Sequence, residues 1–243
     1  MGTSRDLDAI ADFRAARAHV LDTVGAACLR ADRDPGEVTL VAVSKTVEAT
    51  RVAAAVEAGL AILGENRVQE AEAKAPLLPG ARWHLIGPLQ SNKARRAVEL
   101  FDVVESVDSA DLARRLDRIA GEAGHAPLSV YLQVNVDRDD AKAGYLPETL
   151  EAELPALVAL PNLRFLGLMT VGRLVEVPED ARPTFVRLRE LSERLRGRVG
   201  ELGAGLSMGM SDDYPIAVEE GATVIRVGRA LFGPRPGGAG GEA

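Results

Sequence analysis

The sequence predicts a single parallel (β/α)₈ barrel, and three observations support this prediction. Short runs rich in β-branched and apolar residues alternate with segments of helical periodicity, which is typical of parallel α/β folds. Eight such runs occur in 243 residues, the usual size of this barrel. No linker-like segment divides the chain. A doubly wound open sheet is the alternative fold, and the count of eight favours the barrel.

Composition indicates a globular domain and argues against several classes of partner. Hydrophobic residues make up 47% of the chain and charged residues 27%, which is enough for a sizeable core. The net charge of −7 and an aromatic content of 4% argue against nucleic acid as the partner. No run is long enough to span a bilayer, and the first residues carry no hydrophobic signal core. We therefore expect a cytoplasmic protein without a membrane partner.

The single cysteine and the acidic composition suggest the compartment and the oligomeric state. Cys28 is the one cysteine of the chain, so it forms no internal disulfide and fits a reducing compartment. The acidic composition, poor in apolar patches, favours a monomer.

The chain begins with a predicted amphipathic helix over residues 4–31. Apolar residues such as Ile10, Phe13, Val20 and Val24 recur near helical spacing, and Asp34-Pro35-Gly36 breaks the pattern. The predicted organisation is an N-terminal helix packed on the barrel (1–35), the barrel (36–233) and a disordered glycine- and proline-rich tail (234–243).

Eight strands are predicted in order, each an apolar run bounded by turn residues. They cover residues 38–47, 60–66, 82–87, 102–108, 128–136, 163–170, 206–211 and 222–228. Helical periodicity follows most of them, at Ala49–Val56, at 67–75, at 91–100, at Leu112, Leu116 and Ile119, and from Phe185 to Leu195.

Lys45 lies at the end of the first predicted strand, and two interpretations of it are open. Burying an ammonium is costly unless it is paired or its pKa falls. One interpretation is a lysine whose amine extends to solvent from the strand end. The other is a nucleophilic amine that forms a Schiff base.

Polar residues and glycines gather at the predicted strand ends, where active sites form in such barrels. These positions are Lys45, Asn66, His84 with Gly87, Ser106 with Asp108, Asn135, Met169 with Thr170, Ser207 to Ser211, and Arg226 with Gly228.

The last two strand ends resemble an anion site. Ser207 and Ser211 flank Gly209, a helix is expected to begin at Ser211 or Asp212, and Arg226 precedes Gly228. Hydroxyls and exposed backbone N–H groups after strands 7 and 8 often bind phosphate in these barrels. A pair of ordinary strand-to-helix turns is the alternative.

Metal and acid–base chemistry have little support. His19, His84 and His125 lie in different elements without metal-ligand spacing, and no cysteine partners complete such a site. We expect no metal site, and we expect His84 to be structural. Asp212 and Asp213 are better explained as helix-capping residues than as catalytic carboxylates.

Several motifs together resemble the pyridoxal phosphate homeostasis protein family, also called proline synthase co-transcribed proteins. They are Val41-Ala-Val-Ser-Lys-Thr, Gly64-Glu-Asn-Arg-Val-Gln-Glu, Trp83-His-Leu-Ile-Gly-Pro-Leu-Gln-Ser-Asn-Lys, Gly167-Leu-Met-Thr, Leu206-Ser-Met-Gly-Met-Ser-Asp-Asp and Ile225-Arg-Val-Gly. The resemblance runs in order from about residue 39 to 233. It implies a barrel of the alanine racemase N-terminal-domain type with an extra N-terminal helix, also similar to that of fungal-type ornithine decarboxylase.

The resemblance implies that the chain binds pyridoxal 5′-phosphate (PLP). Lys45 would hold it as a Schiff base, Asn66 would lie beside the ring, and Arg226 would face the pyridine nitrogen. Ser207, Ser211, Gly228 and the backbone of Arg229 would hold the phosphate. Two positions depart from the family pattern: Arg229 stands where Thr or Ser is common, and Asp139 where Glu is more usual.

The resemblance also favours a carrier over an enzyme. Related racemases use a tyrosine from a second domain opposite the lysine, and a single lysine serves one face of a substrate only. We therefore expect a protein that buffers or delivers PLP, with apo PLP-dependent enzymes as partners and no catalytic residue of its own. The alternatives are a PLP-dependent amino-acid racemase or decarboxylase and a Schiff-base aldolase acting on a phosphosugar, which would be colourless.

Overall fold

A computed structural model describes residues 4–173 and 175–234, and in it eight parallel strands close into a barrel. Each strand pairs with the next along the chain, and β1 pairs with β8 to close the ring, with Val41 opposite Arg226. The strands are β1 (Thr39–Val43), β2 (Ile62–Glu65), β3 (Arg82–Leu85), β4 (Val103–Val107), β5 (Leu128–Gln133), β6 (Leu163–Met169), β7 (Gly205–Ser207) and β8 (Val224–Val227). The barrel prediction is confirmed.

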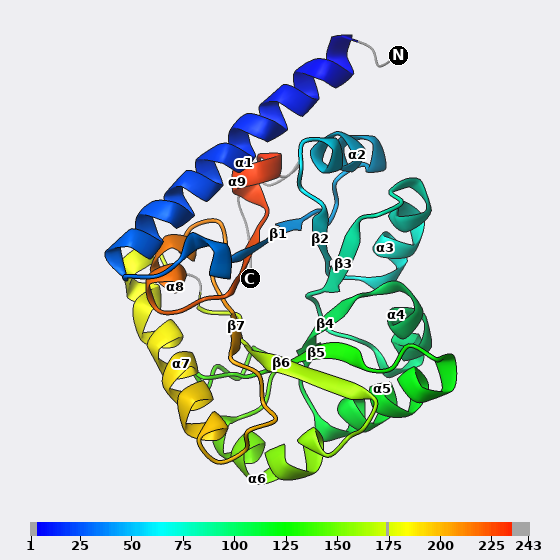
Figure 1. Cartoon of the computed structure of the whole chain (residues 1–243), viewed down its shortest axis with the longest axis vertical. Helices are drawn as coiled ribbons and strands as arrows, with labels where there is room; N and C mark the ends of the chain where they lie inside the picture. Colours follow the sequence, from blue (N-terminus) through cyan, green and yellow to red (C-terminus); the bar gives the residue numbers. More distant parts are fainter. Residues whose placement is uncertain (1–3, 174, 235–243) are drawn as a thin grey trace.

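Helices follow the strands and lie outside the ring (Figure 1). They are α2 (Ala49–Glu57), α3 (Val68–Lys74), α4 (Ala94–Leu100), α5 (Ala110–Ala123), α6 (Pro147–Val158), α7 (Arg182–Arg196), α8 (Tyr214–Glu219) and α9 (Arg229–Phe232), after the N-terminal helix α1 (Ser4–Arg30).

The observed strands stop earlier than the apolar runs predicted. Residues 38–47 were expected to be extended, but β1 ends at Val43, because the carbonyl of Ser44 accepts the N–H of Val47 (3.1 Å) and closes a turn. Lys45 therefore lies within this turn. The seventh predicted strand, residues 206–211, is also shorter than expected. β7 ends at Ser207, and the N–H of Asp213 donates to the carbonyl of Met210 in the turn that follows.

Two helices differ from the expectation. α6 lies in a segment for which no helix was predicted, because Pro147 opens it and Pro155 interrupts its pattern. The predicted helix start at Ser211 or Asp212 is wrong, since α8 begins at Tyr214. The carboxylate of Asp213 accepts the N–H of Met210 (2.6 Å) and makes no cap hydrogen bond, so it stabilises the turn before the helix and not the helix itself.

The barrel interior has an apolar layer below a charged one. Inward-facing side chains pack together in an apolar cluster formed by Val41, Val103, Tyr131, Met169 and Val224. Because successive strand residues alternate between faces, Glu105 and Arg226 face inward two positions further along β4 and β8. Outward-facing apolar residues pack with the helices in one larger cluster.

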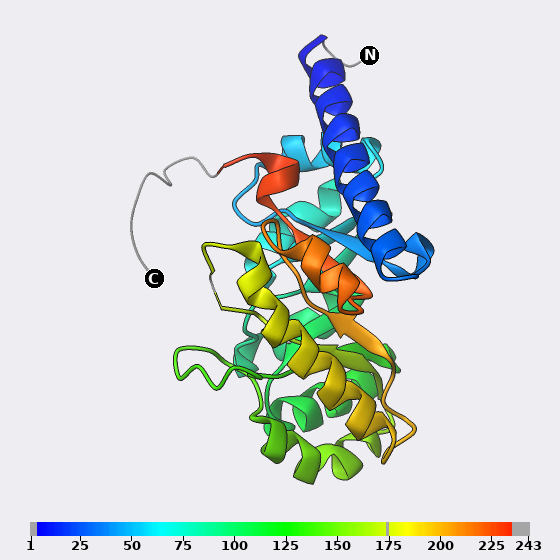
Figure 2. The same cartoon turned by 90° about the vertical axis from the view of Figure 1, so that its left-hand side faces the viewer.

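Helix α1 packs along one side of the barrel against α2, α8 and α9, and its N-terminal end extends beyond the barrel (Figure 2). Phe13 of α1 lies edge-on to Phe232 of α9, with ring centroids 5.4 Å apart, and Arg51 of α2 lies over the Phe13 ring. The N-terminal helix is thus connected to the segment that follows β8.

Apart from Pro234, the predicted tail (234–243) lies outside the described residues, and the boundary between residues 35 and 36 stays a prediction. Within residues 4–173 and 175–234, none of the helices has the length and apolar character needed to cross a membrane.

We expect Phe13→Ala to destabilise the protein, because Phe13 is 3% exposed and its removal leaves a cavity between α1 and α9. The loss should be about 3 kcal/mol, or about 10 °C in melting temperature, measured by circular dichroism. Leu29→Ala is the matched control, because Leu29 is 82% exposed on the same helix. Equal melting temperatures for the two variants would contradict the packing of α1.

Candidate functional site

A cavity of about 570 Å³ opens at the carboxyl ends of the strands. Its volume is within the range of small-molecule sites. Its walls include most of the side chains proposed to bind the cofactor, namely Lys45, Asn66, Ser211, Arg226, Gly228 and Arg229. The ends of β1, β2 and β8 and the loop after β7 thus meet around one space.

Lys45 occupies the second position of the turn formed by residues 44–47. Thr46, at the third position, has a φ of +63°, a left-handed conformation that is unusual for a β-branched residue. Lys45 is partly exposed and contributes to the cavity wall together with Val43.

Another part of the cavity wall combines a hydroxyl with backbone donors. The Ser211 hydroxyl accepts hydrogen bonds from the N–H groups of Gly228 (3.2 Å) and Ala230 (3.4 Å). Gly209 has a φ of +92°, and a Cβ atom there would lie 2.6 Å from that of Ala217, so only glycine fits. Gly209 therefore lets the loop after β7 lie close to α8, and the Ser211 contacts join this loop to the segment after β8.

Arg229, where the family commonly has a hydroxyl residue, points its guanidinium at Asp212. The two side chains form an ion pair at the rim, and both are more than half exposed. The charge of Arg229 is therefore shared with a carboxylate, while its backbone lies in the wall.

Arg226 projects from β8 into the barrel and is held by three residues. Its Nη1 donates to the Ser207 hydroxyl (2.5 Å) and its Nη2 to the Thr170 carbonyl (2.7 Å), while its Nη1 lies 3.9 Å from the Glu105 carboxylate. With both ends of the planar guanidinium bonded, its orientation at the cavity is fixed.

Glu105 connects Arg226 to β3 and β7. The Ser207 hydroxyl donates to Glu105 Oε2 (2.5 Å), and His84 Nδ1 lies 2.6 Å from Oε1. Burial opposes the charge of Glu105, but the hydrogen bond and charge of His84, with Arg226 and Ser207, outweigh it and hold its pKa below the usual range. Burial also lowers the pKa of Arg226, against the attraction of Glu105 and Asp213.

The buried position of Glu105 inside the barrel was not predicted from the sequence. A charged residue within the apolar run Val103-Val104-Glu105-Ser106-Val107 was the available signal, because alternation from Val103 places it on the inner face. His84, expected to be structural, lies in this network. Ser207 was expected to bind phosphate, yet its hydroxyl is bonded to Arg226 and Glu105, and it is not among the cavity-lining residues.

Other polar strand ends bond to backbone groups. Ser106 donates to the Gly87 carbonyl and Thr170 to that of Val134. The Asn135 amide donates to the carbonyls of Asp139 and Lys142, and the Asp139 carboxylate accepts the N–H of Ala141, so these residues organise the loop after β5. These contacts identify a structural role for Asp139.

Lys142 connects the loop after β5 to the cavity. Its ammonium donates to the carbonyls of Val171 and Gly172, in the loop after β6. Since Val171 lines the cavity, Lys142 supports one wall from behind.

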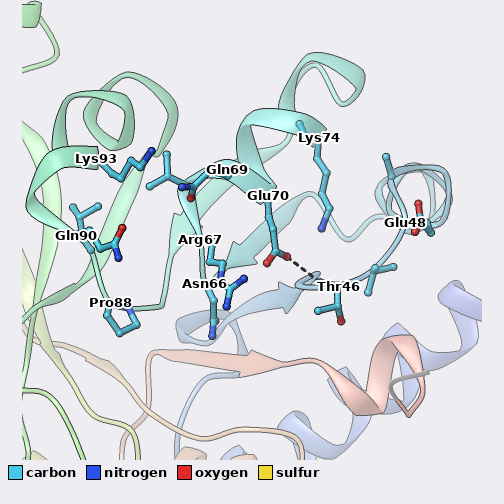
Figure 3. A pocket seen from close by; sticks show the side chains of 15 residues that line it. Thr46, Glu48, Asn66, Arg67, Gln69, Glu70, Lys74, Pro88, Gln90 and Lys93 are labelled. Atoms are coloured by element: carbon cyan, nitrogen blue, oxygen red, sulfur yellow. Dashed lines mark hydrogen bonds between the residues drawn. The ribbon is translucent and has the colours of Figure 1, made fainter. Parts of the chain in front are cut away.

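A second cavity, of about 1000 Å³, adjoins the first at Asn66 (Figure 3). Arg67, Glu70, Gln90 and Lys93 are among its lining residues. Gly87 lets the backbone after β3 lie close to Asn66, because a Cβ atom there would lie 2.5 Å from the carbonyl oxygen of Asn66. Of these two cavities, the smaller one has Lys45 and Arg226 in its wall and the larger one has neither, so the candidate chemistry belongs to the smaller cavity.

The smaller cavity holds few groups suited to proton transfer. Its carboxylates are Asp212, paired with Arg229, and Asp213, whose pKa is raised by burial and whose oxygen accepts the Met210 N–H. Among the described lining residues there is no tyrosine, histidine or cysteine. In the part of the chain that the structure describes, no group of three His, Cys, Asp or Glu residues is arranged to hold a metal ion.

Comparison with known proteins adds a family to this geometry. The family model "Alanine racemase, N-terminal domain" matches residues 26–236. A protein of Pseudomonas aeruginosa called pyridoxal phosphate homeostasis protein is 46% identical over 225 residues, covering 91% of this chain and 95% of its own. An Escherichia coli protein of the same name is 38% identical, covering 90% of this chain and 94% of its own.

Solved structures agree on the fold. PipY of Synechococcus elongatus, solved with PLP bound, is 45% identical with a TM-score of 0.79, over 88% of this chain and all of its own. An alanine racemase of Streptomyces coelicolor, 24% identical with a TM-score of 0.68, shares the fold over 93% of this chain but only 59% of its own.

We expect Glu105→Gln to lower the free energy of unfolding by about 3 kcal/mol at neutral pH, because it leaves Arg226 without its buried counter-charge. The folded-state pKa of Glu105 is lowered, so its contribution is complete above the unfolded value near 4.5 and is lost as the pH falls through the folded value.

Urea unfolding should therefore show the same difference in free energy of unfolding between wild type and variant from pH 7 down to about pH 4.5. Between about pH 4.5 and pH 3 this difference should become smaller. Glu99→Gln, at an exposed site on α4, is the control and should change the stability little at pH 7. A difference that widens in acid would contradict the assignment.

Proposed function

The chain belongs to the family of pyridoxal phosphate homeostasis proteins, and from this we propose that it binds PLP and maintains its supply without converting a substrate of its own. PLP supplies an aldehyde that condenses with a neutral lysine amine, releasing water, and a pyridine ring that can accept electrons. One observation carries the proposal: Lys45, Arg226 and the Ser211–Gly228 wall line the same cavity of about 570 Å³.

Lys45 is the proposed covalent anchor, as a Schiff base. It is the one lysine that lines this cavity among the described residues. Hydrogen bonds to the Ser44 carbonyl and from the Thr46 N–H hold the backbone on each side of it and limit how its Cα can move. A relative supports this assignment: the structure of PipY contains PLP. Asn66, at the cavity wall, is the proposed neighbour of the ring.

We assign the phosphate to the wall formed by Ser211, Gly228 and the backbone of Arg229. The Ser211 hydroxyl already lies between two backbone N–H groups, and such groups favour an anion when they converge. Ser207 remains a proposed phosphate residue, although its hydroxyl contacts Arg226 and Glu105 in this structure. The Arg229 side chain, paired with Asp212, receives no phosphate role.

We assign the pyridine nitrogen to Arg226. A guanidinium donates hydrogen bonds and does not give up a proton at neutral pH, so it keeps that nitrogen unprotonated. The ring is then a poor electron sink, which suits retention of PLP better than carbanion chemistry. The hydrogen bonds to Ser207 and Thr170 hold the guanidinium in one plane.

The acid–base groups among the described cavity-lining residues support a carrier over a racemase. Racemisation needs proton donors on both faces of the substrate carbon. The described cavity wall offers Lys45 and two carboxylates, each already hydrogen-bonded or ion-paired. A PLP-dependent amino-acid racemase or decarboxylase is the alternative function, and we expect at most weak racemase-like activity.

We further propose a cytoplasmic monomer whose recipients are apo PLP-dependent enzymes. The buried, unpaired thiol of Cys28 supports a reducing compartment. The name shared by the relatives, homeostasis protein, supports delivery or buffering.

Lys45→Ala should abolish the visible absorbance of lysine-bound PLP and leave the fold intact. The measurement is an absorbance spectrum of purified protein after incubation with PLP, with circular dichroism as the test of folding. Lys93→Ala is the control, since Lys93 lines the neighbouring cavity. Retention of the absorbance in Lys45→Ala would refute the anchor, and a colourless wild type would favour the aldolase alternative.

Incubation with single enantiomers of alanine and serine should produce no more racemate or decarboxylation product than an equal concentration of PLP in solution. Chiral chromatography measures the outcome. Turnover well above that of PLP alone would replace the carrier function with an enzymatic one.

A further inference from the structure

The turn that carries Lys45 is held from both ends by side chains of α3. Before Lys45, the Ser44 carbonyl accepts a hydrogen bond from the Lys74 ammonium (2.7 Å). After it, the Thr46 N–H donates to Glu70 Oε2 (3.0 Å), the contact marked by the dashed line in Figure 3. The backbone on each side of Lys45 is thus fixed to the same helix.

The spacing of the two α3 residues explains this arrangement. Glu70 and Lys74 are four positions apart, which places them on one face of the helix a turn from each other. A negative side chain meets the donor N–H and a positive one meets the acceptor C=O, so each charge matches the backbone group that it contacts.

The backbone conformation of Thr46 is strained, so the turn depends on this support. Its φ of +63° is a conformation that glycine and asparagine adopt readily and β-branched residues avoid. Such a conformation persists where the surroundings hold it, and the hydrogen bond to Glu70 acts on the strained residue itself.

Lys74 is in turn held rigidly. Its ammonium also donates to Glu65 Oε1 (2.7 Å), and the Ser44 hydroxyl donates to the same oxygen (2.8 Å). Lys74 is 7% exposed and Glu65 fully buried, so water does not compete for these contacts. Ser44, immediately before Lys45, is therefore fixed through both its carbonyl and its hydroxyl.

We propose that Glu70 and Lys74 are positioning residues that set the direction of Lys45 into the PLP cavity. They line the larger cavity, whereas Lys45 lines the smaller one, so they act through the backbone of the turn. This inference rests on the proposed function of Lys45 as the anchor for PLP.

The test uses Glu70, because changing Lys74 would leave the buried Glu65 unpaired and endanger folding. Glu70→Ala should raise the dissociation constant for PLP about tenfold, which corresponds to the loss of one charge-assisted hydrogen bond. An absorbance titration with PLP measures this constant. Glu70→Gln keeps an oxygen acceptor and should retain most of the affinity. Glu72→Ala is the control on the same helix, because Glu72 contacts Arg96 at the surface.

A second variant separates positioning from a general effect on α3. Glycine adopts a positive φ without strain, so Thr46→Gly should make the turn less dependent on Glu70. Glu70→Ala in the Thr46→Gly background should then cost about threefold or less in PLP affinity, against about tenfold in the wild-type background. A merely structural role of Glu70 predicts equal losses in both backgrounds.

A measurement without PLP distinguishes failure of the positioning role of Glu70 from failure of the proposed PLP-binding function. Amide hydrogen exchange, measured by NMR, should show a protected Thr46 N–H in wild type and Glu72→Ala and faster exchange in Glu70→Ala. Unchanged exchange together with unchanged PLP affinity in Glu70→Ala would overturn the positioning role. Faster exchange in a protein whose wild type does not bind PLP would refute the proposed function and retain the support of the turn.

Discussion

A charged guanidinium inside a closed barrel is the constraint on which the rest of the site depends. Arg226 is 4% exposed, and burying its charge is unfavourable without a counter-charge and fixed acceptors. Glu105 of β4, Ser207 of β7 and the Thr170 carbonyl just after β6 provide them, and His84 of β3 holds Glu105. Closure of the ring is what brings these strands around one residue, so fold and site are stabilised together.

The two ends of the cavity are organised by the same principle. At one end, charged side chains of the interior orient Arg226; at the other, Glu70 and Lys74 hold the backbone around Lys45. Both supports lie outside the set of residues that line the smaller cavity. The hydrogen bonds of Arg226 and Lys74 are buried, whereas the one between Thr46 and Glu70 is exposed. A site prepared in this way binds a ligand with little loss of conformational entropy, which suits a protein whose task is to hold a cofactor.

The fold was predictable because strand and helix periodicities differ and their count matched one barrel. The candidate residues at the strand ends were also predictable, since parallel strands present these ends at one rim. Two features were not predictable from local patterns: α6 contains Pro155, and the positive φ of Thr46 depends on a contact with Glu70, 24 residues further along. The inward position of Glu105 follows from strand alternation, but its partners come from other strands. Ser207 shows the same limit: a serine at a strand end can face a ligand or another side chain, and its bond to Glu105 crosses 102 positions of sequence.

Covalent trapping tests the central claim, that Lys45 anchors PLP in this cavity, most directly. Borohydride makes a lysine–PLP linkage permanent, and peptide mass spectrometry then identifies the modified residue among the lysines at positions 45, 74, 93 and 142. At an equal ratio of PLP to protein, the account predicts modification of Lys45 almost alone. Label spread over Lys93 and Lys142, or located on them with Lys45 unmodified, would contradict it.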